Sequence, residues 1–309
     1  MKAVCDEIAR ELGSERKRAT IRIQTRILKA ISDFMHEREM PQLMPVMLSP
    51  ATDPLSHSTS EAAVEYGGQK LKLTKSMILH KQIALLSIPR LYVISPNIRL
   101  EGKEEEKTGR HLIEFSQLDM EFRDFSKEDF MQFAEALVVY VLGSVKGECA
   151  LELGILGRKL KVPSIPFKRY ESRTLAERGG IGPAVDELSE IEREPFWVMD
   201  LEREFYDRED GEKKGYFHNY DLVYPDGFGE ALSGGEREFE HEKIVRRIKE
   251  TGQDPKDFES YLGFAEKGHL QKSAGGGLGI ERLVRYCAGL KDIKEVCLFP
   301  RKPGAAIHI

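Results

Sequence analysis

The sequence predicts an α+β fold in one domain, in which an antiparallel sheet is flanked by helices. Alternating apolar and polar runs recur along the chain, and hairpin-like turns rather than helical crossovers join most neighbouring runs. Other stretches carry apolar residues at helical intervals. The length of 309 residues suits one large domain. We therefore treat residues 1–309 as a single unit.

The first 40 residues predict a helical N-terminal segment. Within residues 15–38 the apolar positions at mostly helical intervals are Ile21, Ile23, Ile27, Leu28, Ile31 and Phe34. Pro41 ends this helix, because proline lacks the backbone N–H that a helix needs. Residues 42–55 contain further prolines and predict a short extended segment.

The middle of the chain predicts sheet strands and one buried helix. The strand-like runs are LKLTKS (71–76), LYVISPNIRLE (91–101) and RHLIEFSQLDMEFRDF (110–125). Ser126 and Asp129 have the spacing of a capping box and predict the start of a helix that extends to about Val145. Prolines and glycines interrupt every regular pattern in residues 150–190, which predicts a peripheral insertion.

The last third predicts two more strands, three helices and a final strand. The strand-like runs are PFWVMDLEREFYD (195–207) and YFHNYDLVYP (216–225). Two helices are predicted in 236–252 and 255–268, and a glycine-rich strand leads into a third helix in 274–290. The run VCLFPR (296–301) predicts the last strand.

Composition limits the possible functions. The chain has 47 Lys and Arg against 52 Asp and Glu, a net charge of −5, whereas proteins that mainly bind nucleic-acid backbone usually have a basic excess. The four cysteines have no C-x-x-C spacing that would suit zinc or a redox pair. The apolar run 136–145 is far shorter than the roughly 20 residues that span a bilayer. We expect a cytoplasmic protein without a membrane partner.

Two clusters could carry chemistry. In the first, glycines at 275–279 precede a helix from which Arg282 projects, so that its guanidinium could hold a phosphate. A tight-packing glycine turn would explain that run equally well. In the second, Arg99 and Glu101 lie on one predicted strand, and alternate positions of the returning strand share one face. Those returning residues are Arg110, His111, Glu114, Phe115, Gln117, Asp119 and Glu121.

Together the clusters resemble the catalytic core of class II aminoacyl-tRNA synthetases of the aspartyl/asparaginyl branch. Pro45 matches the first family motif, residues 99–121 the second and residues 277–282 the third, and the resemblance covers roughly residues 20–301. The runs LTKSMILHKQ, SPNIRLE, SGGEREFEHEKIV and SAGGGLGIERLVR are similar to a catalytic-core paralogue in this branch that has no anticodon-binding domain. The resemblance implies the class II antiparallel sheet flanked by helices.

The resemblance also implies an ATP site. Arg99 would bind the α-phosphate and meet the attacking carboxylate, Glu101 would accept a hydrogen bond from the adenine amine, and Phe115 would stack on the base. Arg110 and His111 would reach the β- and γ-phosphates. Arg282 would hold the γ-phosphate and, with Arg99, form the catalytic pair. The implied ATP site also includes Leu112, Glu230, Gly279, Ile280 and Glu281.

A magnesium site is implied at Asp221 and Glu230, with Ser233 as a further ligand or a substrate contact. Taken alone, the two carboxylates could be an ordinary acidic pair on neighbouring strands.

The implied amino-acid site favours aspartate. In the run from Ser76 to Gln82, Lys81 matches the aspartyl pattern, and an ammonium pairs with a carboxylate better than with an amide. Arg237 would be a second cation on a substrate carboxylate, although in isolation both cations could be solvated helix charges. The full implied set is Ser76, Lys81, Gln117, Asp119, Ser233 and Arg237. Ile78 replaces a family glutamine, so Gln117, Asp119 or Glu61 would bind the amino group.

We therefore expect asparagine synthesis from aspartate, ATP and ammonia, with AMP and pyrophosphate as the other products. Only about 40 residues precede Pro45, where family members carry a barrel that binds tRNA, so tRNA is not the expected partner. Activation at the β-carboxylate would require aspartate to be turned end for end, with Lys81 and Arg237 on the other carboxylate. The alternatives are a truncated synthetase that charges tRNA or another acceptor, and a regulatory subunit without activity. A homodimer through residues 20–45 is also expected.

Overall fold

The computed structural model describes residues 2–177 and 180–307, and within them one seven-stranded sheet dominates the fold. Its strands lie in the order β4-β5-β10-β9-β8-β7-β6, and all neighbours are antiparallel except the parallel pair β6 and β7. The strands are β4 (Arg90–Ile98), β5 (Glu114–Arg123), β10 (Ser273–Gly279), β9 (Gly229–Glu236), β8 (Asn219–Tyr224), β7 (Phe196–Met199) and β6 (Lys168–Glu171). The predicted α+β class is confirmed. Since β10 lies between β5 and β9, the glycine-rich run enters the middle of the sheet.

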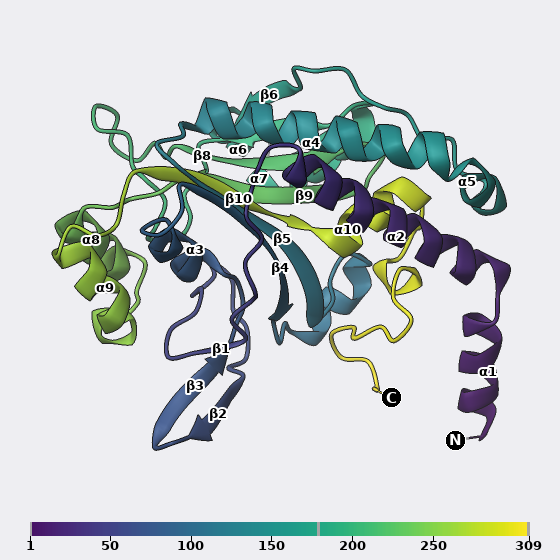
Figure 1. The fold of residues 1–309 in the computed structure, drawn as a ribbon, viewed down its shortest axis with the longest axis horizontal. Coiled ribbons are helices and arrows are strands. Elements are labelled where there is room, and N and C mark those ends of the chain that lie inside the picture. The colour runs from purple at the N-terminus through teal and green to yellow at the C-terminus, as the bar shows by residue number, and fades with distance from the viewer. Residues whose placement is uncertain (1, 178–179, 308–309) are drawn as a thin grey trace.

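Long helices cover one face of the sheet (Figure 1). These are α2 (Glu15–His36), α4 (Lys127–Glu148) and α10 (Ile280–Ala288), and all three were predicted. In α2 the periodic residues Ile23, Ile27 and Ile31 are fully buried in the main core. Ser126 and Asp129 form the expected capping box of α4.

By length and composition alone, α4 is the one helix in the described residues that could cross a membrane. Its buried residues pack in the main core, as those of a core helix do.

Smaller elements surround the other face. A three-stranded sheet of β1 (Leu48–Ser49), β3 (Gln69–Leu73) and β2 (Ala63–Tyr66) projects from the body, as Figure 1 shows. The predicted run 71–76 contributes to this sheet rather than to the main one. Helix α3 (Ile78–Ala84) follows it, and α8 (His241–Glu250), η2 (Pro255–Phe258) and α9 (Glu259–Glu266) form a second core with α3. Helix α1 (Lys2–Leu12) extends away from the body (Figure 1).

Residues 150–190, predicted to be a peripheral insertion, contain regular elements at one edge of the main sheet. The segment contains α5 (Ala150–Leu156), β6, α6 (Ser172–Ala176) and α7 (Ile181–Ile191), and β6 is the last strand of the main sheet. Leu175, Ala184 and Leu188 pack on residues of β7 and β8 in a third core. The prolines and glycines of this segment separate short helices and strands instead of preventing them. Residues 178–179 lie outside the described residues.

Two further strand predictions need correction. Residues 296–301 follow the short helix η3 (Ile293–Glu295) as irregular chain, and Leu298 and Phe299 are exposed rather than packed in a sheet. Arg99 and Glu101 lie just beyond β4, and residues 110–112 lie just before β5. Between them the charged loop forms a 3-10 helix, η1 (Lys103–Thr108).

Candidate active site

A cavity of about 400 Å³ opens beside η1, where β4 and β10 end and β5 begins. Ten of the eleven residues predicted to bind ATP line it: Arg99, Glu101, Arg110, His111, Leu112, Phe115, Glu230, Gly279, Glu281 and Arg282. The eleventh, Ile280, is buried at the start of α10 and packs in the main core. Residues far apart in the sequence thus meet in what we call the nucleotide cavity.

The inner part of the nucleotide cavity suits a flat base with an amine. The Arg99 guanidinium carbon lies 5.1 Å from the centre of the Phe115 ring. Glu101 Oε1 lies 3.3 Å from His57 Nε2, whereas Glu101 Oε2 is buried and has no hydrogen-bond partner in the described residues. Burial acts to raise the pKa of Glu101, but His57, His111 and Arg99 lower it overall. An ionised acceptor without a partner is therefore available to an N–H donor.

The outer part carries the expected cations, each with a protein partner. Arg282 Nη1 lies 3.1 Å from Glu230 Oε1, and Arg110 Nη1 lies 2.6 Å from Asp186 Oδ1 on α7. Burial, and then Arg282, lower the pKa of His111.

Glu281 has a structural contact that the prediction did not include. Its carboxylate accepts the backbone N–H of Ser116 at 2.9 and 3.0 Å, which ties the start of α10 to β5.

A second cavity of about 240 Å³ adjoins the first, and Arg99, Gln117, Glu230 and Gly277 line both. We call it the amino-acid cavity, because all six residues predicted to bind aspartate line it: Ser76, Lys81, Gln117, Asp119, Ser233 and Arg237. Glu61 does not line it. Glu61 lies beside the projecting small sheet and pairs with Lys70. Its suggested role in amino-group binding stays a prediction.

The floor of the amino-acid cavity is a buried ionic network. Lys81 Nζ lies 3.1 Å from Asp119 and 3.4 Å from Glu121, and it donates to two backbone carbonyls. Arg237 binds both oxygens of Glu121 at 3.1 and 3.3 Å and lies 3.5 Å from Asp207. The side chains of Lys81 and Arg237 are only 2% and 3% exposed, so neither is a solvated helix charge.

Glycines make this network possible. A Cβ at Gly275 would collide with the Glu121 carboxylate, and one at Gly277 would collide with the Gln117 amide. The side chains of β5 therefore lie across β10, which explains the glycine-rich run by close approach.

The predicted metal ligands lie together at the junction of the two cavities. Asp221 on β8 is the cross-strand partner of Ser233 on β9, and Glu230 is also on β9. Among the residues that the structure describes, no three His, Cys, Asp or Glu side chains gather to hold a metal. Magnesium usually takes one or two carboxylates together with substrate phosphates, so two carboxylates and a hydroxyl fit an ion that arrives with ATP.

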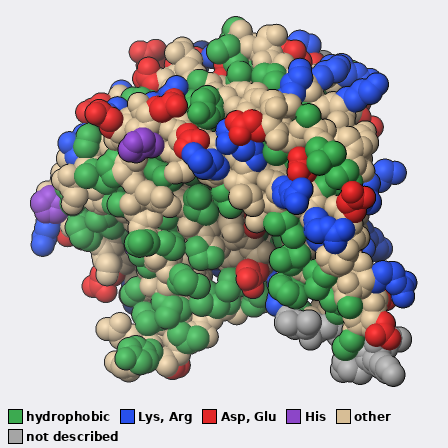
Figure 2. Space-filling model, turned by 45° about the vertical axis from the view of Figure 1, so that its right-hand side comes forward, with side chains coloured by type: hydrophobic (Ala, Val, Ile, Leu, Met, Phe, Trp, Pro, Cys, Tyr) green, Lys and Arg blue, Asp and Glu red, His purple; other side chains and the backbone are tan. Residues whose placement is uncertain are grey.

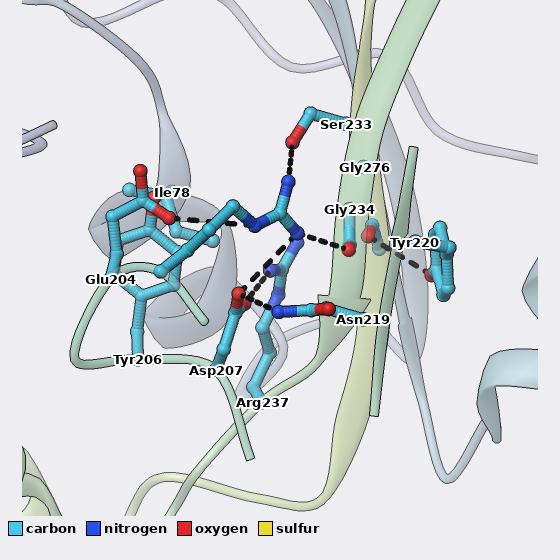
Figure 3. Close-up of polar contacts among 12 residues, drawn as sticks. Ile78, Glu204, Tyr206, Asp207, Asn219, Tyr220, Ser233, Gly234, Arg237 and Gly276 are labelled. Carbon is cyan, nitrogen blue, oxygen red and sulfur yellow. Dashed lines mark hydrogen bonds and ion pairs between the residues drawn. The ribbon is translucent and has the colours of Figure 1, made fainter. Parts of the chain in front are cut away.

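Sequence reasoning missed Arg203, from the loop between β7 and β8. Its guanidinium lies 2.5 Å from Asp221 Oδ1, donates to Ser233, and donates to the Gly234 carbonyl at 2.9 Å. Figure 3 shows the groups around it. Burial, and then Glu230, raise the pKa of Asp221 to about 6, although Arg203 opposes this shift.

Asp53, also missed, lines the same cavity. Burial, and then the charge of Glu204, raise its pKa to about 6. The only sequence signal for Arg203 was a polar stretch after a buried strand. For Asp53 it was a loop rich in proline.

Comparison with known proteins places this geometry in a family. The family model of tRNA synthetases class II (D, K and N) matches residues 5–303. The aspartate–tRNA(Asp/Asn) ligase of Methanothermobacter thermautotrophicus is 33% identical over 92% of this chain and 67% of its own length. The asparagine–tRNA ligase of Pyrococcus abyssi is 28% identical over 95% of this chain and 70% of its own length.

A solved structure has the same fold. Asparaginyl-tRNA synthetase from Pyrococcus horikoshii, complexed with asparaginyl-adenylate, superposes with a TM-score of 0.86 at 24% identity. The match covers 96% of this chain and 71% of that one. Since the family model covers nearly the whole sequence, this chain belongs to the class II tRNA synthetases of the D, K and N type, a family of ATP-dependent ligases.

Proposed function

We propose that this protein makes asparagine from aspartate, ATP and ammonia, through an aspartate β-carboxylate activated as an adenylate. The observation that carries the proposal is the junction at Arg99, where an amino-acid cavity built on Lys81 and Arg237 meets the nucleotide cavity. The cations that line this cavity, Lys81, Arg99, Arg203 and Arg237, favour an acid over its amide. The net charge of −5 favours a small acceptor over a nucleic acid.

The reaction needs two transfers and no protein nucleophile. First, a β-carboxylate oxygen of aspartate attacks the α-phosphorus of ATP, and pyrophosphate leaves. Then the nitrogen of ammonia attacks the acyl carbon, AMP leaves with the former carboxylate oxygen, and the nitrogen loses a proton to solvent.

In the first transfer, Arg99 would bind the α-phosphate and the incoming carboxylate together, and Arg282 would leave Glu230 to bind the γ-phosphate. Mg2+ held by Asp221, Glu230 and Ser233 would offset phosphate charge.

Amino-acid analysis of the products tests the proposal. The protein is incubated with ATP, Mg2+ and aspartate, with and without ammonium and with and without tRNA. We expect free asparagine and AMP in amounts that depend on ammonium and not on tRNA. Asparagine that persists without ammonium would point to another nitrogen donor and contradict the proposal.

The second candidate is transfer of aspartate to tRNA or another macromolecular acceptor. The names of the relatives, aspartate–tRNA and asparagine–tRNA ligases, favour it. A charging assay with labelled aspartate and bulk tRNA separates the two, because only this candidate gives acid-precipitable label.

A regulatory subunit without activity is opposed by the retention of Arg99, Glu101, Asp221, Glu230 and Arg282 around the two cavities. Pyrophosphate exchange that depends on aspartate would exclude it.

A further inference from the structure

The loop between β7 and β8 places an adjacent cation and anion, Arg203 and Glu204, in the amino-acid cavity. Each side chain is only 12% exposed. Figure 3 shows Glu204 on one side of the guanidinium group, with Ser233, Gly234 and Asp207 around the rest. The predicted function gave this pair no role.

The pair lies at the outer end of a series of alternating charges. From the floor outward these charges are Lys81, Glu121, Arg237, Asp207, Arg203 and Asp221, with each neighbour within 3.5 Å of the next. The two inner cations are already neutralised by protein carboxylates. Turning either cation toward a ligand would leave Glu121 buried without a full partner, which costs several kcal/mol. Lys81 and Arg237 therefore stabilise the walls of the cavity more than they contact the substrate.

Arg203 is also paired, with Asp207 and Asp221, but within the described part of the chain one of its N–H groups remains free for a ligand. Arg203 Nε is buried and donates no hydrogen bond within the described residues. Its distance to Glu204 Oε2 is 3.8 Å, too long for a hydrogen bond. A buried donor without a partner is costly unless a ligand completes it.

Asp53 adds a second anion to the same place. The charge of Glu204, after burial, contributes to the raised pKa of Asp53, so the two carboxylates repel each other across the cavity. An ammonium group between them would relieve that repulsion. The cavity thus offers the Nε–H group of one guanidinium beside two carboxylates, which complements the zwitterionic end of an α-amino acid.

We propose that Arg203 binds the α-carboxylate of aspartate and that Glu204, with Asp53, binds its α-ammonium group. This arrangement directs the β-carboxylate toward Arg99 and the nucleotide cavity. The inference rests on the proposed function, since activation at the β-carboxylate leaves both α-groups free to be bound. Arg237 then acts as a positioning residue that holds Arg203 through Asp207, and Lys81 holds Arg237 through Glu121.

Calorimetry with aspartate analogues tests the assignment. Isoasparagine lacks the α-carboxylate charge, succinate lacks the amino group, and asparagine lacks the β-carboxylate charge. We expect the native protein to bind aspartate about 10- to 100-fold more tightly than isoasparagine or succinate, the range of a charged hydrogen bond. Arg203→Gln should abolish the preference over isoasparagine, and Glu204→Gln the preference over succinate.

Two controls separate recognition from folding. Arg193→Gln removes an exposed arginine paired with Asp226 and should leave every affinity unchanged. Arg203→Lys should restore part of the preference over isoasparagine. If Arg203→Gln weakens all analogues by the same factor, its role is structural and the assignment is overturned.

A separate result would contradict the proposed orientation of bound aspartate. If Arg203→Gln abolishes the preference for aspartate over asparagine instead, Arg203 binds the β-carboxylate and the assignment is wrong. The product assay stays independent of these affinities. Asparagine formation with unchanged analogue preferences would overturn the inference alone, and absence of asparagine at any ammonium concentration would overturn the proposed function.

Discussion

At the scale of single residues, the site balances buried charges that are close to one another. Four cations and six carboxylates line the amino-acid cavity: Lys81, Arg99, Arg203, Arg237, Asp53, Asp119, Glu204, Asp207, Asp221 and Glu230. Burial makes each unpaired charge expensive, so removing one member should affect its partners. The following predictions use this dependence.

The pH dependence of stability should change when Asp53 is replaced. Its pKa is raised to about 6 in the folded protein, so folding favours the protonated form and stability is lost as the pH rises from about 4 to 6. Asp53→Asn should therefore stabilise the protein by about 1–2 kcal/mol at pH 7.5 and have little effect at pH 4.5.

Denaturant unfolding at both pH values measures the effect of Asp53→Asn. Asp33→Asn, in an exposed pair with Lys29, is the control and should show no such difference. Equal effects of Asp53→Asn at the two pH values would contradict the raised pKa.

Lys81 should contribute strongly to stability. Lys81→Met leaves Asp119 and Glu121 without their shared cation and should cost about 3–5 kcal/mol in the free energy of unfolding. Lys70→Met removes the exposed partner of Glu61 and should cost much less, because solvent screens an exposed pair. Similar losses in the two variants would show that Lys81 is not held as described.

At the scale of elements, β10 brings the two cavities together because its glycines let β5 side chains cross it. Gly277→Ala should push the Gln117 amide into the junction and weaken binding of aspartate and ATP by at least about tenfold. Gly143→Ala on α4 is the control, since a Cβ there would have nothing within 4 Å. Calorimetry checks both variants, and equal affinities for them would contradict the role given to Gly277.

Hydrophobic periodicity was sufficient to predict α2, α4 and most of the sheet, because each element has one clear apolar pattern. It failed in residues 150–190, where α5, α6 and β6 are too short for a pattern to stand out and Pro183 interrupts the pattern in the first turn of α7. It also failed at residues 296–301, whose apolar residues remain exposed in the structure.

Residues within family motifs, such as Arg99 and Lys81, were predicted from the sequence. Arg203 was not, because its partners Asp221 and Ser233 come from other strands and only the fold brings them together.

At the scale of the whole molecule, the surface suggests where two copies would meet. Figure 2 shows hydrophobic side chains gathered on the lower left of the face it views. Met44, Met47 and Leu48 are 89%, 52% and 42% exposed in the segment after α2, within or next to the region expected to form a dimer. We propose that this segment is part of a C2 interface.

Light scattering during gel filtration tests the interface. We expect a mass near twice 35.2 kDa, and Met44→Lys with Met47→Lys should shift it toward the monomer. The exposed substitution Leu151→Lys on α5 is the control and should leave the mass unchanged. A monomeric native protein would contradict this proposal without affecting the proposed chemistry.

The central claim is that the side-chain carboxylate of aspartate is adenylated and then captured by ammonia. Aspartate labelled with 18O in the β-carboxylate, incubated with ATP, Mg2+ and 15N-ammonium, tests it by mass spectrometry of the products. Our account predicts one 18O atom in AMP and 15N in the amide of asparagine. Unlabelled AMP from this substrate, together with labelled AMP from aspartate carrying 18O in the α-carboxylate, would contradict it.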